Sequence, residues 1–249
     1  MRKQILTLTV ESNTDAGDGM SVLTLSGPDC PAMLPGQFVE VEVPGAGVLL
    51  RRPISVFDSD TGRLSLLVRA AGRATDVLAH IQPGTALSVV GPLGRGFAMD
   101  GRRPLLVGGG VGLAPLYLLA RRYSAQGVRP RLIAGFRTAP SQLLKDLYAR
   151  YAEVTVCTDD GSEGIRGNVC AAPALQHIDA DMVQVCGPLP MMKAVAGAAR
   201  TAAVPCQVSL ENKMACGLGA CLCCVENTTT GNRCVCTDGP VFNINELTW

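Results

Sequence analysis

A group of cysteines near the carboxyl end places the strongest constraint on this sequence. Six of the eleven cysteines lie between residues 214 and 242. Cys216, Cys221 and Cys224 have the spacing C-x4-C-x2-C, and Cys236 follows after eleven further residues. Three thiolates on a glycine-bearing loop and a fourth from a returning segment form the plant-type ligand pattern of a [2Fe–2S] cluster. The spacing therefore predicts a one-electron redox centre.

Two other cysteines could serve as ligands at this segment, and zinc is the alternative to an iron–sulfur cluster. Cys223 and Cys234 lie close enough in sequence to compete as ligands. Structural zinc usually takes paired C-x2–4-C knuckles, which this spacing fits poorly. Gly217 and Gly219 suit a loop wrapped round an inorganic core, where backbone N–H groups reach the sulfurs. We expect a [2Fe–2S] cluster rather than zinc, with Cys216, Cys221, Cys224 and Cys236 as the ligands.

Length, charge and cysteine content limit the class of protein. A chain of 249 residues favours more than one domain, and a net charge of +1 gives no reason to expect nucleic acid or an anionic membrane as partner. The first fifteen residues alternate like a strand and do not resemble a signal peptide. No apolar run approaches the roughly 18 residues of a membrane-spanning helix. Eleven cysteines in such a chain predict a cytoplasmic protein with free thiols and not a disulfide scaffold.

Residues 1–100 have the pattern of a small antiparallel β domain. Short alternating runs are separated by Gly- and Pro-containing turns, and only residues 74–81 look helical. Regular short strands with such turns predict a barrel or sandwich. The expected strands are residues 7–12, 21–27, 37–44, 53–60, 63–70 and 86–92.

Three segments of this domain suggest a flavin site. In Arg52-Pro53-Ile54-Ser55, proline belongs at a strand edge, and its neighbours supply a cation and a hydroxyl. Residues 72–75 open the short helix, where free N–H groups and Thr75 could meet a phosphate. Residues 91–97 form a turn-rich exit. Each segment alone is consistent with an ordinary turn, but the ordered set resembles the flavin-binding barrel of the ferredoxin–NADP reductase superfamily.

Residues 101–210 change to alternating strands and helices. A short apolar strand, residues 104–107, precedes a glycine-rich turn and a helix over residues 113–124. Gly109, Gly110 and Gly112 would admit a phosphate at this turn. Pro115 stands in place of the third glycine of G-x-G-x-x-G, and no acidic residue follows about 20 positions on. A plain tight turn is the alternative interpretation.

The following units predict a parallel sheet with helices on both faces. Strands are expected at residues 131–136, 153–158, 182–186 and 207–210, with helices near residues 141–150 and 190–203. Cys186, Gly187 and Pro188 follow the third of these strands, at the edge where such sheets bind ligands. In the superfamily this turn lies beside the nicotinamide. The alternative is a buried cysteine that ends a strand.

Other polar residues give weaker signals. Asp159, Asp160 and Glu163 could form an acid–base pair, but a solvated loop near the nucleotide is the better interpretation. His80 and His177 have no metal-ligand spacing and are expected to have a structural or surface role. No nucleophilic triad is evident, and cofactor redox chemistry needs none.

Taken together, the chain resembles the electron-transfer subunits of class 1B dihydroorotate dehydrogenase. The resemblance rests on the ordered segments RRPIS, GRAT, GPLGRGF, GGGVGLAPL, TDDGSEGIRG, CGPLPMMKAV, SLENKMACGLGACLCCV and VCTDGPVF. It implies FAD at Arg52–Ser55, Leu67, Val68, Arg69, Gly72, Ala74 and Thr75, and NAD at the glycine turn and Cys186–Pro188. It assigns the cluster to the four cysteines above and excludes Cys223.

The resemblance also implies partners and a domain order. A catalytic dihydroorotate dehydrogenase subunit that carries FMN would donate electrons, which leave as a hydride to NAD+, in a heterotetramer of two plus two subunits. The fold class is then α+β multidomain: an FAD barrel at residues 1–100, an NAD-binding α/β domain at 101–210 and a cluster segment at 211–249. The rivals are a subunit of a hydrogenase, sulfite reductase or transhydrogenase complex, and a zinc-stabilised nucleotide-binding module.

Overall fold

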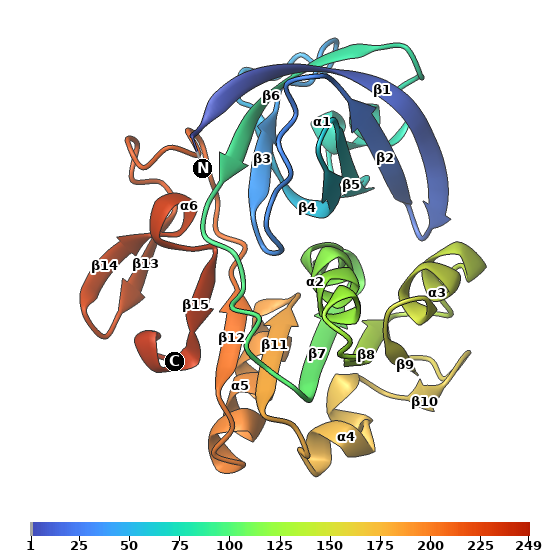
Figure 1. The fold of residues 1–249 in the computed structure, drawn as a ribbon, viewed down its shortest axis with the longest axis vertical. Helices are drawn as coiled ribbons and strands as arrows, with labels where there is room; N and C mark the ends of the chain where they lie inside the picture. The colour runs from blue at the N-terminus through green and yellow to red at the C-terminus, as the bar shows by residue number, and fades with distance from the viewer. Residues whose placement is uncertain (1) are drawn as a thin grey trace.

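The computed structural model describes residues 2–249, which form a barrel, a sheet flanked by helices and a cysteine-bearing segment (Figure 1). The barrel lies above the sheet in this view, and the cysteine-bearing segment lies beside both. Among residues 2–249 no helix is long and apolar enough to cross a membrane.

Six antiparallel strands close the barrel in the order β1-β2-β5-β4-β3-β6. Along β1, Leu6, Leu8 and Val10 are buried while their neighbours face water, the period of two that fills a barrel interior. The first strand is longer than expected because it continues into a hairpin at Gly17, Asp18 and Gly19, all at positive φ. The elements are β1 (Gln4–Gly17), β2 (Met20–Ser26), β3 (Phe38–Val41), β4 (Arg52–Asp60), β5 (Arg63–Arg69), α1 (Arg73–Ala79) and β6 (Ala86–Leu93).

Seven strands form the sheet, in the order β10-β9-β8-β7-β11-β12-β15, and all but β15 run parallel. The parallel strands are β7 (Pro104–Gly109), β8 (Arg131–Phe136), β9 (Glu153–Thr158), β10 (Ile165–Arg166), β11 (Met182–Cys186) and β12 (Cys206–Ser209). The helical elements are η1 (Gly110–Leu113), α2 (Ala114–Ala125), α3 (Gln142–Ala149), η2 (Val169–Ala171), α4 (Pro173–Gln176) and α5 (Leu189–Thr201).

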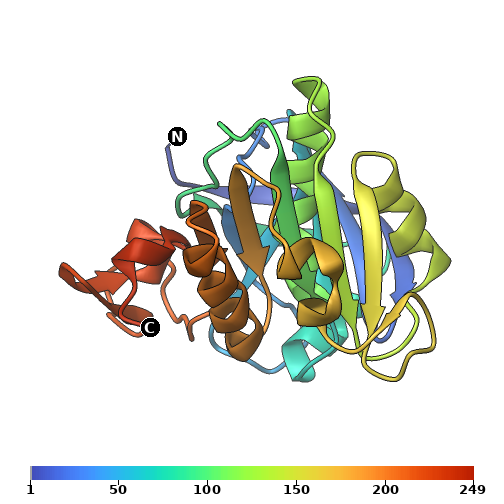
Figure 2. The same ribbon diagram turned by 90° about the horizontal axis from the view of Figure 1, so that it is seen from below.

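Both faces of the sheet are covered. Leu105 and Val107 of β7 pack with α5, whereas Leu106 between them packs with α2. Figure 2 shows α4 and α5 on the side away from the barrel. The central strand therefore reads as a continuous apolar run, as expected for a strand buried on both faces.

Helix α2 joins the sheet to the barrel. The ring of Tyr117 stacks on Phe57 of β4 with centroids 4.2 Å apart. Arg121 of α2 makes ion pairs with Asp58 at 3.0 Å and Asp60 at 2.8 Å. These contacts hold the mouth of the barrel over the carboxyl ends of the parallel strands.

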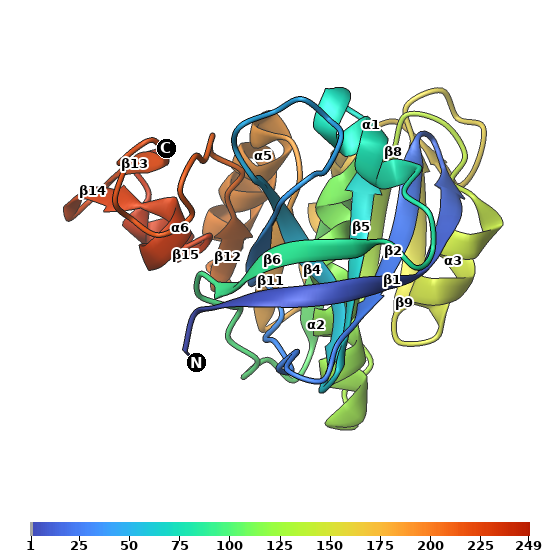
Figure 3. The ribbon, with the colours of Figure 1, turned by 90° about the horizontal axis from the view of Figure 1, so that it is seen from above.

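The cysteine segment, residues 211–240, leaves the sheet after β12 and returns to it at β15 (Val241–Asn243). Ser209 of β12 is paired with Val241 of β15. The segment contains a hairpin of β13 (Val225–Thr228) and β14 (Gly231–Cys234), followed by α6 (Val235–Asp238), and η3 (Ile244–Glu246) lies beyond β15. Figure 3 shows this segment projecting from the side of the molecule. Neither the hairpin nor the return to the sheet is predicted by the sequence pattern.

Candidate functional site

A cavity of about 420 Å³ lies between the barrel and the start of the cysteine segment. We call it the barrel cavity. Strands β4 and β5 form one wall, and residues 210–214 form the other. Its lining residues are Phe38, Pro53, Ile54, Ser55, Leu67, Arg69, Ala71, Thr75, Val111, Ala114, Leu210, Glu211, Asn212, Lys213, Met214 and Pro240.

Six of the residues expected to bind FAD line this cavity: Pro53, Ile54, Ser55, Leu67, Arg69 and Thr75. The others lie beside it. Arg52 donates hydrogen bonds to the carbonyl oxygens of Leu50 and Arg51. Val68 and Ala74 are buried in the barrel core, so only their backbones can face a ligand.

The Thr75 hydroxyl already has partners in the protein. Its oxygen accepts hydrogen bonds from the backbone N–H groups of Ala71 at 3.0 Å and Gly72 at 3.1 Å. The hydroxyl also donates to the carbonyl of Gly72 at 3.0 Å. Thr75 therefore fixes the turn that precedes α1, a capping role that places this turn at the rim of the cavity.

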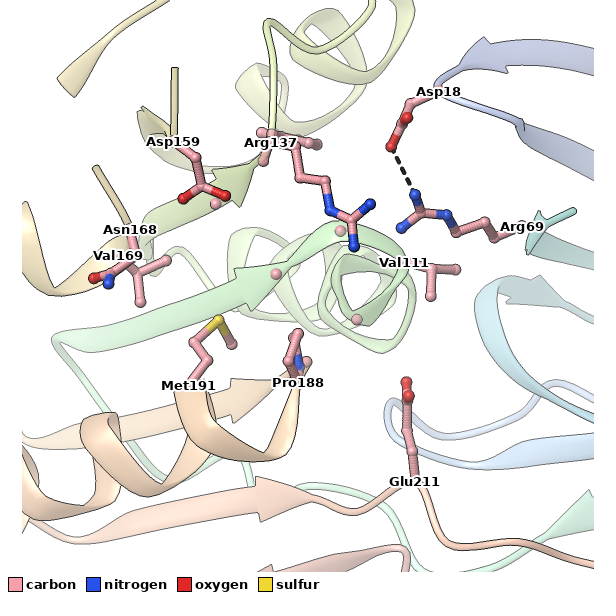
Figure 4. A pocket seen from close by; sticks show the side chains of 16 residues that line it. Asp18, Arg69, Val111, Arg137, Asp159, Asn168, Val169, Pro188, Met191 and Glu211 are labelled. Atoms are coloured by element: carbon pink, nitrogen blue, oxygen red, sulfur yellow. Dashed lines mark hydrogen bonds and ion pairs between the residues drawn. The ribbon is translucent and has the colours of Figure 1, made fainter. Parts of the chain in front are cut away.

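A second cavity, of about 290 Å³, lies at the carboxyl ends of the parallel strands (Figure 4). We call it the sheet cavity. Gly109, Gly110, Gly112, Gly187 and Pro188, all expected to bind the nucleotide, meet here. The Cys186 side chain is buried behind them, and burial raises the pKa of its thiol well above its usual range. The remaining lining residues are Asp18, Arg69, Val111, Gly135, Phe136, Arg137, Asp159, Asn168, Val169, Met191 and Glu211.

Close packing of two turns explains the glycines at this cavity. A Cβ atom at Gly112 would lie 2.5 Å from the Cα of Gly187. A Cβ atom at Gly109 would lie 2.6 Å from the sulfur of Met191. Only glycine allows the turn after β7 to touch the turn after β11. The cavity floor is therefore backbone, as a phosphate-binding site requires.

The two cavities share part of their lining: Arg69, Val111 and Glu211 belong to both. The Arg69 guanidinium pairs with Asp18 of the β1–β2 hairpin at 3.2 Å. Glu211 is open to the cavities yet enclosed by protein elsewhere, and this desolvation raises the pKa of its carboxyl group. Sequence reasoning missed Glu211, because it is a single acidic residue after a strand.

The four expected cluster ligands form two pairs. Cys224 and Cys236 are buried, and the backbone N–H of Cys236 donates to the Cys224 sulfur at 3.4 Å. Cys216 and Cys221 lie close enough for Cys221 to help lower the pKa of the Cys216 thiol. Among residues 2–249 no three His, Cys, Asp or Glu side chains are placed to hold a single metal ion. Two pairs of thiols suit a two-iron core, which takes two protein ligands at each iron.

The backbone around the pairs is turned toward sulfur. The Leu218 N–H donates to Cys216 at 3.3 Å and, with further N–H groups of residues 220 and 221, lowers the pKa of that thiol to about 6. Burial, with the neighbouring Cys224 thiol, raises the pKa of Cys236 to about 12. N–H groups directed at sulfur are a feature of iron–sulfur sites. The donor set therefore fits a [2Fe–2S] cluster.

The two competing cysteines are placed differently from the four. The Cys223 side chain is exposed. Cys234 is partly buried, and its pKa is raised by desolvation and by the nearby Cys224. Its backbone N–H donates to Asp238 at 3.0 Å. Within residues 2–249, neither Cys223 nor Cys234 has a sulfur that accepts a hydrogen bond, as the sulfurs of Cys216 and Cys224 do.

Glu40 of β3 lies beneath the cysteine segment and was not anticipated. It is 1% exposed, and within the described chain neither carboxyl oxygen has a hydrogen-bond partner. A Cβ atom at Gly217 would lie 2.7 Å from its Cγ. Desolvation, with a smaller contribution from Cys216, raises the pKa of Glu40 to about 7. A single acidic residue within a short strand gives no sequence signal for such a contact.

Comparisons with known proteins agree with this layout. The family of the iron-sulfur cluster binding domain of dihydroorotate dehydrogenase B matches residues 211–248. The oxidoreductase FAD-binding domain family matches residues 8–97. The dihydroorotate dehydrogenase B (NAD(+)) electron transfer subunit of Bacillus caldolyticus is 40% identical, over 96% of this chain and 97% of that one. Its counterpart in Shouchella clausii is 38% identical, over 99% of each.

Solved structures show the same fold. A chain of an NADH-dependent reduced ferredoxin-NADP oxidoreductase superposes with a TM-score of 0.85 and 29% identity, over 97% of this chain and 90% of that one. The FAD/NAD-binding domain of a nitric oxide dioxygenase from Vibrio cholerae reaches a TM-score of 0.69 at 20% identity, over 80% and 93%. The second likeness concerns the fold alone.

Proposed function

The chain belongs to the family of the electron transfer subunits of dihydroorotate dehydrogenase B (NAD(+)), and we propose that it carries electrons from a dihydroorotate-oxidising partner to NAD+. The substrate of the whole enzyme would be oxidised on the partner subunit. This chain would provide the route to the nicotinamide, and the complex would serve pyrimidine biosynthesis in the cytoplasm.

The order of the three sites is the observation that carries the proposal. Met214 lines the barrel cavity and lies two residues before Cys216. The barrel cavity in turn shares Arg69, Val111 and Glu211 with the sheet cavity. A cluster, a flavin and a nicotinamide would therefore lie in line, each next to the following one. Such a series suits electrons that enter singly and leave in pairs.

When bound, the cluster supplies single-electron transfer. FAD can take up two electrons one at a time and, with a proton, release them together as a hydride. We assign the cluster to Cys216, Cys221, Cys224 and Cys236, and FAD to the barrel cavity. At that cavity, Ser55, Arg69 and Thr75 are the polar side chains of the expected motifs. Asp18 orients Arg69 from the sheet-cavity side.

We assign NAD+ to the sheet cavity. The backbone floor at Gly110, Gly112 and Gly187 would accept the diphosphate, since glycines bring no side chain of their own into the cavity. Pro188 and Val111 would flank the nicotinamide at the end shared with the barrel cavity. Close approach at this end is required, because hydride transfer needs reacting atoms about 3–3.5 Å apart.

The partner would dock near the cysteine segment. Leu218 and Leu222 are 49% and 62% exposed, and both lie between or beside expected cluster ligands. Exposed apolar side chains grouped at one place mark interaction surfaces. We propose a catalytic FMN-containing subunit at this surface, in an assembly of two catalytic and two electron-transfer subunits.

Co-expression with a dihydroorotate-oxidising, FMN-containing subunit tests the proposal. The purified complex should contain FAD and a [2Fe–2S] signal in electron paramagnetic resonance, and should reduce NAD+ when given dihydroorotate. Mass measurement of the intact complex would give its stoichiometry. A complex that forms but reduces NAD+ only with hydrogen or a sulfur donor would replace the proposal with one of the rival complexes.

A further inference from the structure

Arg69 is the one cationic side chain of residues 2–249 that lines both the barrel cavity and the sheet cavity. In the proposed function, on which this inference rests, FAD occupies the barrel cavity and NAD+ the sheet cavity. Both ligands carry a diphosphate. A single guanidinium therefore lies between two anions, and its orientation decides which of them it serves.

The Arg69 guanidinium lies at the glycine floor of the sheet cavity. Its Nη1 atom is 3.5 Å from the position that a Cβ atom on Gly110 would occupy. Gly110 is the first residue of η1 and brings no side chain into the space beneath the guanidinium. A phosphate on this floor is therefore within reach of Nη1, although Arg69 itself belongs to β5 of the barrel.

Asp18 holds the guanidinium in this position. Its Oδ2 atom lies 3.2 Å from Nη2 of Arg69 (Figure 4). Within the described chain Arg69 makes no other side-chain hydrogen bond or ion pair, so Nη1 keeps its donors for a ligand. The Asp18 side chain lines the sheet cavity and not the barrel cavity. The ion pair therefore draws Arg69 toward the sheet cavity.

The hairpin that carries Asp18 is fastened to the sheet and its helices. The hydroxyl of Ser141, the N-cap residue of α3, donates to the carbonyl of Ala16. A Cβ atom on Gly17 would lie 3.0 Å from the Cβ of Ser141. Gly17, Asp18 and Gly19 all have positive φ, a region that aspartate tolerates better than most residues. Although β1 and β2 belong to the barrel, Asp18 is therefore fixed at the edge of the sheet cavity.

We propose that Asp18 is a positioning residue that directs the shared Arg69 guanidinium to the nicotinamide dinucleotide instead of to FAD. The planar guanidinium has several donor edges, so it can bind a carboxylate at one edge and a phosphate at another. With Asp18 in place, Nη1 is offered to the diphosphate of the dinucleotide. Without Asp18, the flexible side chain turns to the diphosphate of FAD. Loss of Asp18 should therefore change the two affinities in opposite directions.

Asp18→Asn tests the proposal in the protein that contains FAD and the cluster, because asparagine tolerates the same positive φ without the charge. Calorimetry should show NAD+ binding weakened by about two- to fivefold, the range expected for a partly exposed ion pair. The rate of FAD release, followed by flavin fluorescence, should fall by a similar factor. These opposite changes are the signature of a guanidinium that is shared between two ligands.

Asp15→Asn is the matched control. Asp15 lies in the same hairpin but does not line the sheet cavity, and it accepts a hydrogen bond from the Gly17 N–H at 2.8 Å, which asparagine can retain. This variant should leave NAD+ affinity and FAD release unchanged. In a protein that already carries Arg69→Gln, adding Asp18→Asn should also change neither quantity, because Asp18 acts through Arg69.

Four results would overturn the inference. Tighter NAD+ binding in Asp18→Asn, with or without Arg69, would show that the carboxylate only repels the ligand. Weaker binding of both NAD+ and FAD would give Asp18 a merely structural role in the hairpin. An unchanged NAD+ affinity in Asp18→Asn would remove Asp18 from recognition and leave the proposed function intact. An unmodified protein that contains FAD but binds no NAD+ would refute the proposed function as well.

Discussion

The sheet cavity and the cysteine segment are both built from turns beyond strand ends, but different forces shape them. At the cavity, two glycine turns touch through their backbones, and α2 and α5 pack behind them. In the cysteine segment, residues 211–223 make no backbone-to-backbone hydrogen bond with any residue of the described chain. Their N–H groups turn to sulfur instead. The cavity is thus shaped by packing, whereas we expect the segment to depend on its cluster for much of its order.

The sharpest test of this contrast is Cys224→Ser. The buried thiol contacts Cys236, so its loss should abolish the [2Fe–2S] cluster. FAD should stay bound, because the expected FAD residues on the barrel wall of its cavity belong to the packed part. Visible absorption and iron and flavin content give the measurement. The exposed neighbour provides the control, and Cys223→Ser should leave the cluster spectrum unchanged. Loss of FAD together with the cluster would show that the barrel cavity also depends on the metal.

Gly112→Ala should damage the packed part and spare the segment. The new Cβ would meet the Gly187 backbone at 2.5 Å, which no side-chain rotation relieves. Overpacking of this kind costs about 1–3 kcal/mol, and we expect NAD+ binding to weaken by tenfold or more. The cluster spectrum should not change.

Gly197→Ala is the matched control for this substitution. Gly197 lies within α5, where a Cβ atom would meet nothing within 4 Å. Alanine in a helix interior should raise stability by up to about 1 kcal/mol. Calorimetry would measure NAD+ binding to both variants. Equal losses of affinity in Gly112→Ala and Gly197→Ala would show that glycine contacts do not shape the cavity.

Glu40→Gln tests the contact between the barrel and the cysteine segment. A carboxyl group with a pKa near 7 in the folded protein and an ordinary value in the unfolded chain binds more protons when folded. Stability must then fall as pH rises from the unfolded pKa to about 7, by about 3 kcal/mol in total. Glutamine removes this cost, so the metal-free variant should be more stable than the parent at pH 8 and similar to it near pH 4.

Denaturant midpoints at the two pH values give the measurement. Glu42→Gln is a suitable control, because the Glu42 side chain is 61% exposed and pairs with Arg51 at the surface. If Glu40→Gln stabilised the protein equally at both pH values, the ionised Glu40 carboxylate would not be the source of the predicted loss of stability.

The smallest effect is expected at the joint between barrel and sheet. Arg121→Gln removes the ion pairs with Asp58 and Asp60, which are only partly shielded from water. We expect a loss of about 1 kcal/mol and a small decrease in melting temperature. FAD, cluster and NAD+ binding should persist, because Phe57 and Tyr117 still stack across the joint. A large loss of NAD+ binding would mean that the ion pairs, and not the ring stack, align the two cavities.

Much of the fold was predictable because its signals are local. Alternation of apolar residues along β1 and the apolar run of β7 reflect burial on one face or on two, and both elements were expected. Pro190 near the start of α5 and the glycine turn before α2 mark helix starts by backbone chemistry. The return of β15 to the sheet was not predictable, since three residues give no periodic signal.

The site residues that belong to one sequence motif were predictable. Those that come together only because distant segments meet in the fold were not. Ser55 and Arg69 were expected at a flavin site, and both line the barrel cavity. Glu211 and Asp159 follow different strands, and only the parallel sheet brings them to opposite ends of one cavity. Glu40 is a single acidic residue within a short strand, and the segment that covers it lies far away in sequence.

The pairing of Ser209 with Val241 has a consequence for how such a chain could arise. The cysteine segment starts and ends on neighbouring strands at the outer edge of the sheet, so its two ends are already held together. A short turn could join β12 to β15 in its place without disturbing the strands whose ends line the sheet cavity. Gain or loss of the redox centre would then require only an exchange at one edge of an otherwise complete reductase, which makes the segment a natural unit for grafting between proteins.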